Sequence, residues 1–155
     1  MNEENFLNEA VTMAAQNVKN GGGPFGAVIV KDGKIIGRGI NRVTETNDPT
    51  AHAEVTAIRD ACKNLDEFRL DGAVIYTSCE PCPMCLGAIY WARIEKIVFA
   101  ADKNDAAKAG FDDSFIYDEF ALPHEKRAIP LKRLPLKNAN LPFETWIIHE
   151  GKTKY

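Results

Sequence analysis

The fold is decided by residues 73–101, which read AVIYTSCEPCPMCLGAIYWARIEKIVFAA. Residues 73–78 and 96–101 are short apolar runs rich in the β-branched and aromatic residues that favour strands. Residues 83–92 lie between them and are typical of a helix, since proline is tolerated in a first helical turn and Cys82 stands near the cap position. A strand, a helix and a second strand in this order indicate an α/β layered fold.

The flanking sequence continues this alternation of helices and strands. The other predicted elements are helices over residues 3–18, 52–65 and 142–150, strands over 25–31 and 34–41, an edge strand over 129–134, and short helical turns within 102–120. Asp32-Gly33 is a two-residue hairpin signal, so the sheet is expected to be mixed rather than all parallel. Thr50 is expected to cap the helix that follows it.

The whole chain has 155 residues, a length that fits one domain with its own core. Its hydrophobic fraction is 45% and its charged fraction 26%, both ordinary for a globular protein. No apolar run approaches the roughly 20 residues of a membrane span. The acidic start, MNEENFLNEA, lacks the basic and apolar regions of a signal peptide. We therefore expect a cytoplasmic protein without a membrane partner, in a compartment that keeps thiols reduced.

The net charge of −3 argues against a nucleic-acid partner, because proteins that grip a phosphate backbone usually carry a basic surplus. The charge is unevenly distributed. Residues 121–155 carry seven Lys and Arg against three Asp and Glu, whereas residues 1–120 carry 12 against 19. The basic tail is either a solvated segment or one that docks on an acidic body, its own or a neighbour's.

Two short motifs carry the chemistry: His52-Ala53-Glu54 and Pro81-Cys82-Pro83-Met84-Cys85. Together they match the H-x-E and P-C-x-x-C signature of zinc-dependent nucleobase deaminases. Cys82 and Cys85 lie three residues apart at a helix start, where both sulfurs can reach one ion and the helix N-terminus favours thiolates. With His52 they offer three ligands, which leaves a fourth position open, as in catalytic zinc sites.

Glu54 is the predicted proton shuttle of this site. Residues two apart on a helix do not share a face, so we expect His52 and Glu54 to lie in the first turn, where side chains fold over the helix end. The alternative is that Cys79 joins the other ligands and closes a structural Cys₃His site. Cys62 stands alone in a helical pattern and is expected to be a small buried hydrophobe.

Five stretches of the sequence match a known pattern: GGPFGAVIVKDG, NDPTAHAEVTAIR, YTSCEPCPMCLGAIYWAR, DAAKAGFDDSFIYDE and the terminal KTKY. On these stretches the chain resembles the cytidine-deaminase-like superfamily and, within it, the small bacterial guanine deaminases. The resemblance implies a three-layer α/β/α sandwich with a central mixed five-stranded sheet. It also implies a single deaminase domain over residues 1–155, with residues 130–155 exchanged between the subunits of a homodimer.

The resemblance further implies the reaction and the residues that perform it. The reaction is hydrolysis of the 2-amino group of free guanine, which yields xanthine and ammonia. One zinc ion per subunit is held by His52, Cys82 and Cys85, and Glu54 is the general acid and base. Tyr155, at the end of the exchanged segment, belongs to the substrate pocket.

The substrate pocket needs an acceptor for the N1–H and 2-amino donors of guanine, and a carboxylate suits that task. Asp113 is the predicted acceptor and Asp112 the alternative, since adjacent side chains point apart. The other pocket candidates are Asn41, Phe25, Ala53 and Tyr155. The alternative for Asn41 is that it is only a turn residue, and the alternative for Phe25 is that it is only a core residue. Trp91 is expected in the core.

Three rival functions stay open at this point. A tRNA adenosine deaminase needs a basic face and a site open to a polymer. A deaminase of cytosine or another small heterocycle differs in its pocket acceptors. A structural zinc module would use Cys79 as a ligand and would have no use for Glu54.

Overall fold

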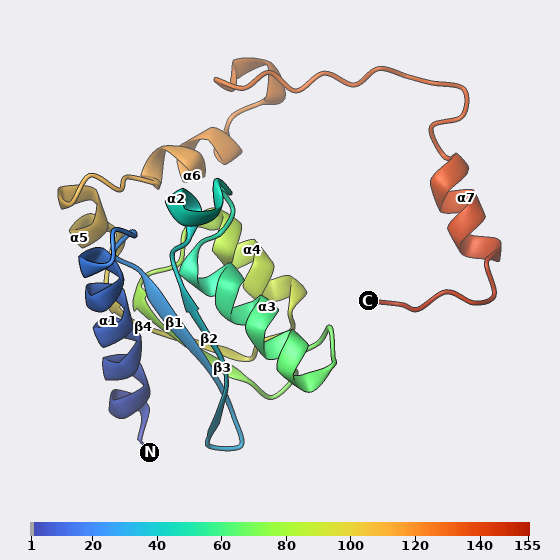
Figure 1. Cartoon of the computed structure of the whole chain (residues 1–155). Helices are drawn as coiled ribbons and strands as arrows, with labels where there is room; N and C mark the ends of the chain where they lie inside the picture. The colour runs from blue at the N-terminus through green and yellow to red at the C-terminus, as the bar shows by residue number, and fades with distance from the viewer. Residues whose placement is uncertain (1) are drawn as a thin grey trace. The chain divides into compact units, whose positions relative to one another are not determined.

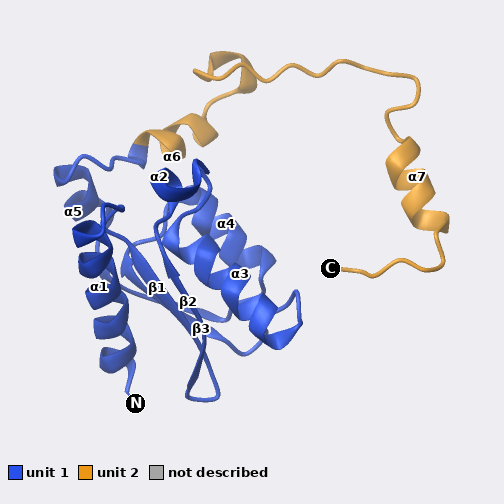
Figure 2. Ribbon diagram, in the orientation of Figure 1, with its two compact units in different colours: residues 1–114 blue, residues 115–155 orange. Residues whose placement is uncertain are grey.

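The computed structural model describes residues 2–155, and the chain divides into two compact units (Figure 1, Figure 2). The first unit extends to Ser114 and the second covers Phe115–Tyr155. All strands of the described residues lie in the first unit. None of the helices described has both the length and the apolar character that a membrane crossing requires.

The first unit is built on a four-stranded mixed sheet in the order β2-β1-β3-β4. The strands are β1 (Gly26–Lys31), β2 (Lys34–Ile40), β3 (Val74–Cys79) and β4 (Lys96–Ala101). β1 is antiparallel to both of its neighbours, and β3 is parallel to β4. Asp32 and Gly33 join β1 to β2 with φ of 51° and 73°, the positive values that a type I′ turn requires. The predicted hairpin and the mixed sheet are therefore confirmed.

Helices cover both faces of this sheet (Figure 1). α1 (Glu3–Lys19) packs on one face, where Phe6 contacts a buried cluster of Val28, Val30 and Tyr76. α3 (Ala53–Leu65) and α4 (Pro83–Trp91) share the other face. The first unit therefore has the three α/β/α layers that the sequence predicts.

α3 lies very close to β2, and glycine makes the approach possible. A Cβ atom on Gly39 would clash with the backbone of Ala53 and Ala57, and one on Gly37 would clash with that of Ala57 and Ala61. The three alanines are spaced four residues apart and so form one face of α3. This close packing fixes the start of α3, where the predicted metal ligand His52 lies.

The remaining helices of the described chain are short. They are α2 (Val43–Thr46), α5 (Lys103–Lys108), α6 (Ser114–Ala121), a 3₁₀ turn (His124–Lys126) and α7 (Leu141–Ile148). α5 and α6 flank Gly110, as predicted for residues 102–120. α7 begins one residue before and ends two residues before the predicted helix.

The structure corrects the prediction of a fifth strand. Residues 127–137 form neither helix nor strand, and the sheet has four strands rather than five. Pro130 lacks the N–H that a ladder needs, and a strand is stable only where a neighbouring strand accepts its hydrogen bonds. No strand pairs with this segment in the described chain.

Two single-residue predictions are also wrong. Thr50 does not cap α3: its backbone N–H and hydroxyl both donate to Asp48 Oδ1, at 2.8 and 2.6 Å. The N-cap of α3 is His52. Trp91 does not lie in the core, because 67% of its surface is exposed at the end of α4.

Candidate active site

His52 stands at the N-cap of α3, outside the helix itself. Its backbone is extended (φ −70°, ψ 159°) and its side chain makes no capping hydrogen bond. The imidazole is therefore free to turn toward α4, while Glu54 lies in the first helical turn. The two residues do not have to share a helical face, because only one of them is on the helix.

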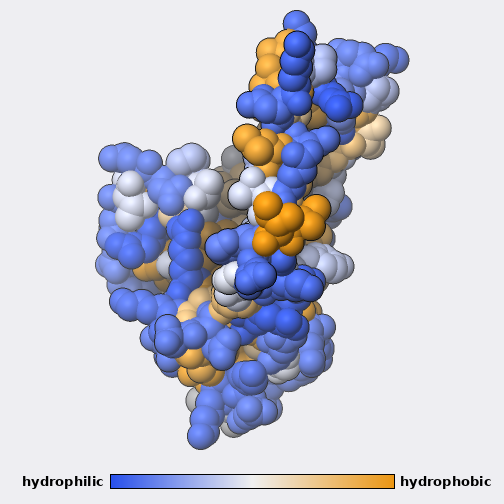
Figure 3. Space-filling model, turned by 90° about the vertical axis from the view of Figure 1, so that its right-hand side faces the viewer, coloured by the Kyte–Doolittle hydropathy of each residue, from blue (hydrophilic) through white to orange (hydrophobic). Residues whose placement is uncertain are grey.

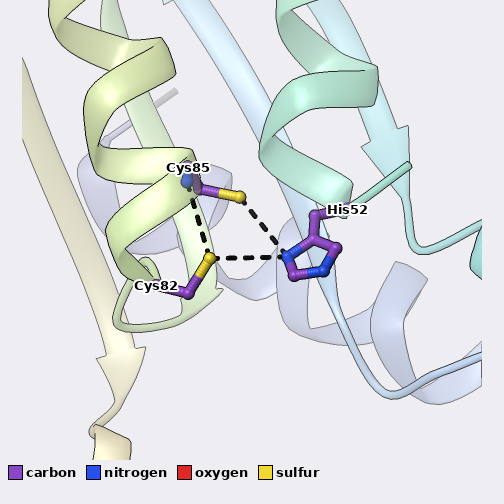
Figure 4. A group of neighbouring side chains, drawn as sticks. All are labelled: His52, Cys82 and Cys85. Atoms are coloured by element: carbon purple, nitrogen blue, oxygen red, sulfur yellow. Dashed lines mark hydrogen bonds between the residues drawn. The ribbon is translucent and has the colours of Figure 1, made fainter. Parts of the chain in front are cut away.

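Cys82 and Cys85 occupy the start of α4 and face His52 (Figure 4). The Nδ1 atom of His52 lies 3.5 Å from each sulfur. Usual Zn–S and Zn–N lengths give a tetrahedron whose N–S edges are about 3.6 Å long. The three side chains thus fit one tetrahedral zinc ion, with its fourth position left for water or substrate.

The three groups differ in their proton equilibria: the pKa of Cys82 is lowered, whereas hydrogen bonding with Cys82 raises the pKa of the Cys85 thiol. Hydrogen bonding with Cys85 and His52 lowers the pKa of the Cys82 thiol to about 4. Hydrogen bonding with Cys82 raises the pKa of His52. Cys82 is therefore poised to be the thiolate that a soft, borderline metal such as zinc prefers.

Cys79 does not join this group. Among the described residues, the cluster with metal-ligand geometry contains His52, Cys82 and Cys85 alone. The Sγ–H of Cys79 donates to the backbone oxygen of Asp102 at 3.6 Å, and burial raises the pKa of its thiol to about 11. The geometry matches the three-ligand arrangement of catalytic zinc sites rather than a closed Cys₃His site. Cys62 lies on α3 and packs against the core, but it is only partly buried and not the buried residue that was expected.

Glu54 is almost fully buried, with 6% of its surface exposed. Burial raises the pKa of its carboxyl group, and the carboxyl also interacts with the thiol of Cys85. A carboxyl with a raised pKa exchanges protons closer to neutral pH than an exposed one. Glu54 thus has the environment of a proton shuttle beside the metal ligands.

A cavity of about 580 Å³ opens onto this group within the first unit. Its volume falls within the range of small-molecule sites, roughly 300–1,000 Å³. Its walls include His52, Cys82 and Glu54, together with the predicted substrate residues Asn41 and Asp113. The structure therefore brings these five predicted residues to one cavity.

The two adjacent aspartates differ in what they contact. Oδ1 of Asp112 accepts from both the backbone N–H and the hydroxyl of Ser114, at 2.9 and 2.6 Å. Asp113 is half-buried in the cavity wall, where desolvation raises the pKa of its carboxyl and its charge helps to raise the pKa of His52. Asp113 is thus the aspartate whose oxygens are available near the metal ligands.

Phe25 lines the cavity and also packs against the core. Its ring meets that of Phe111 edge to face, with centroids 5.1 Å apart. Phe111 lines the cavity too but was missed, although it lies within the GFDD stretch that suggested Asp113. Ala53 is buried in the core and does not line the cavity, so the structure does not place it in the predicted substrate pocket.

Tyr155 lies in the second unit and is 76% exposed. Its ring contacts that of Trp146 edge to face, at 6.5 Å between centroids. Lys152 donates to the backbone oxygens of Ile147 and His149 and so fixes the turn between α7 and the terminus.

Residues 1–101 match the family model of the cytidine and deoxycytidylate deaminase zinc-binding region. The chain therefore belongs to this family, and the metal that its His-Cys-Cys group binds is zinc. The chain is 59% identical to guanine deaminase of Bacillus subtilis over 156 residues, which cover 100% of both chains. The X-ray structure of guanine deaminase from that organism matches with a TM-score of 0.98 over 100% of this chain and 99% of the other.

A second kind of relative belongs to the same family. The tRNA-specific adenosine deaminase of Aquifex aeolicus is 40% identical over 141 residues, which cover 90% of each chain.

Proposed function

We propose that this protein hydrolyses the 2-amino group of free guanine to give xanthine and ammonia. The observation that carries the proposal is the buried Glu54 carboxyl beside three zinc ligands at the wall of one cavity. The full-length identity of 59% to a guanine deaminase supports the choice of guanine. In this reaction a C2–O bond to water oxygen forms, the C2–N bond breaks, and the amine leaves as ammonia.

Proton transfer is the task of Glu54. When bound, zinc supplies a water molecule whose pKa is lowered toward neutrality. Glu54 accepts a proton from the attacking water and returns it to the ring nitrogen. It then takes the second proton from the hydroxyl now on C2 and delivers it to the leaving amine. Its burial favours both directions of transfer, because the raised pKa brings the acid and base forms closer in energy at neutral pH.

The purine is read by polar groups on two sides of the cavity. Oδ1 of Asn41 accepts from the backbone N–H of Val43 at 3.3 Å, so its NH₂ group is the one left to donate to a purine acceptor. Asp113 accepts from the N1–H and 2-amino donors of guanine. Phe25, which lines the cavity, packs against the base.

We also propose that residues 1–155 work as one deaminase domain in a homodimer that exchanges residues 130–155. The cavity is built entirely from residues up to Asp113, so a segment from a second copy can close it. β4 is an edge strand with an unpaired side, and apolar side chains lie open on the molecular surface (Figure 3). Tyr155 of the exchanged segment would enter the neighbour's cavity.

The cytoplasm is the proposed compartment for this activity. Cys82 and Cys85 must be reduced to bind zinc, and a reducing compartment keeps them so. The substrate is a free base, so neither nucleic acid nor a membrane is needed as a partner.

A tRNA adenosine deaminase is the second candidate, favoured by the 40% identity to the Aquifex aeolicus enzyme. The acidic balance of residues 1–120 speaks against it, since a polymer substrate requires a basic face.

The test is ammonia release from zinc-loaded protein offered guanine, adenine, cytosine and a tRNA anticodon stem-loop in parallel. Release from guanine alone supports the proposal. Release from the stem-loop alone replaces it with the second candidate. Release from none of the four contradicts deamination of these substrates and makes a structural zinc module the better reading.

A further inference from the structure

Asn17 is a buried polar residue that the chemistry above does not use. It lies in the last turn of α1 with 6% of its surface exposed, and it does not line the cavity. Its Nδ2 donates to the backbone oxygen of Gly23 and to that of Asn41, both at 2.8 Å. The two acceptors belong to separate segments, the loop after α1 and the exit of β2, and both of these residues do line the cavity.

The two hydrogen bonds use both hydrogens of the Asn17 amide. The backbone oxygen of Asn17 also accepts from the N–H of Gly22 at 2.9 Å. One residue therefore ties the end of α1, the glycine loop and the exit of β2 together. A buried amide whose hydrogens are both engaged holds its acceptors in fixed positions, because leaving either one unpaired is costly.

The glycines of the loop are packed directly against these asparagines. A Cβ atom on Gly22 would lie 2.5 Å from Nδ2 of Asn17. A Cβ atom on Gly23 would lie 3.0 Å from Cγ and Oδ1 of Asn41. The side chain of Asn41 is thus confined by Gly23, while its own backbone is held by Asn17 and its Oδ1 accepts from Val43.

We propose that Asn17 is a positioning residue that sets the orientation of the Asn41 amide, and through it the affinity for the purine base. The inference rests on the proposed role of Asn41 in reading the purine. Asn17 acts without touching the substrate, and its effect belongs to binding rather than to the chemical step.

The first experiment compares two substitutions of the same kind. Asn17→Asp keeps the size of the side chain but removes both donors. It should raise KM for guanine about tenfold, the equivalent of losing the one hydrogen bond from Asn41 to the purine. The values of kcat and zinc content should change little. Asn64→Asp is the matched control. Nδ2 of Asn64 donates at 2.9 Å to the backbone oxygen of Ile36, which lies on β2, the strand that leads to Asn41, but does not line the cavity. This control should leave KM unchanged.

A purely structural role would give a different pattern. If Asn17→Asp lowers kcat, zinc content and thermal stability together while KM is constant, the positioning role is overturned. If that variant does not fold, Gly22→Ala probes Asn17 directly, since its Cβ would displace the Asn17 amide. Gly22→Ala should then raise KM, and an unchanged KM would contradict the proposal.

The second experiment is a double-mutant cycle between Asn17→Asp and Asn41→Ala. If Asn17 acts through Asn41, Asn17→Asp has little further effect on KM once the Asn41 amide is gone. Independent effects that multiply would overturn the positioning role alone. If Asn41→Ala leaves KM unchanged, the proposed reading of the purine by Asn41 fails, and the role of Asn17 fails with it.

Discussion

The unit that ends at Ser114 has a core of buried apolar side chains, whereas no residue of 115–155 is buried. Ile29 and Ile75 have no exposed surface in the first unit. No described residue of the second unit is buried, and Ile129 and Ile148 are 82% and 78% exposed. Extended apolar surface of this kind marks an interaction site.

The two units therefore differ in what stabilises them: a buried apolar core stabilises the first unit, whereas the second has no buried residue. The first unit holds the metal ligands, the proposed proton shuttle Glu54 and the cavity. The second unit leaves apolar side chains exposed, and the proposed exchange would cover them. The predictions below test each side of this contrast.

The largest expected effect is that of Cys82→Ser in the first unit. Serine is a poor ligand for zinc, so the variant should lose its bound metal and all measurable guanine deamination. Zinc content by atomic absorption and ammonia release check this expectation. Cys62→Ser, which removes a thiol outside the metal group, should keep both zinc and activity.

Glu54→Gln should keep zinc but slow turnover by about 10²–10⁴-fold, because the amide cannot shuttle protons. Single-turnover rates and metal content measured on the same sample separate the two properties. Glu67→Gln is a matched control at an exposed position, and its rate should equal that of the unmodified chain. Activity of Glu54→Gln within a factor of two would remove Glu54 from the mechanism.

Tyr155→Ala tests the contribution of the second unit. The variant should raise KM for guanine about tenfold through the loss of one polar and aromatic contact. Lys154→Ala, one residue earlier in the same tail, should leave KM unchanged.

Mixed dimers then show which subunit supplies Tyr155. In a dimer of one Glu54→Gln chain and one Tyr155→Ala chain, exchange leaves one site with both wild-type residues. Such co-expressed, doubly tagged dimers should therefore recover the wild-type KM at half of the sites. A KM that stays raised would mean that Tyr155 acts within its own chain, which contradicts exchange.

The smallest expected effect comes from the same substitution placed in each unit. Ile75→Val should lower the free energy of unfolding by about 1 kcal/mol at any protein concentration, because it opens a small cavity in the core. Ile148→Val should act only through assembly, so its effect on the melting temperature should depend on protein concentration. Calorimetry over a range of concentrations checks both, and a concentration-independent loss for Ile148→Val would speak against exchange.

Local sequence signals predicted much of the fold and of the metal group. β4 lies where the apolar run places it, and Cys82 caps the helix that begins with Pro83. The two cysteine ligands were predicted because the spacing of Cys82 and Cys85 places two sulfurs at one helix end. His52, which is 30 residues from Cys82, was predicted by matching the H-x-E motif. Apart from His52, these features depend on neighbours within a few residues of one another.

Features that depend on distant partners were not predictable in the same way. The bond from Asn17 to Asn41 spans 24 residues and joins a helix end to a strand end. The predicted fifth strand fails because its backbone finds no neighbouring strand in the described chain. Trp91 is exposed although its residue type favours burial.

His52 is the N-cap of α3 although histidine is not a preferred capping residue, because the metal site uses its side chain. Threonine, asparagine, serine and aspartate are the preferred caps, yet α3 begins at a residue whose side chain turns away from the helix. A cap of the preferred type there would stabilise α3 by about 1 kcal/mol and would remove a metal ligand. Position 52 is therefore a trade-off between stability and activity. Engineering that placed a preferred capping residue there would stabilise α3 and disable the metal site.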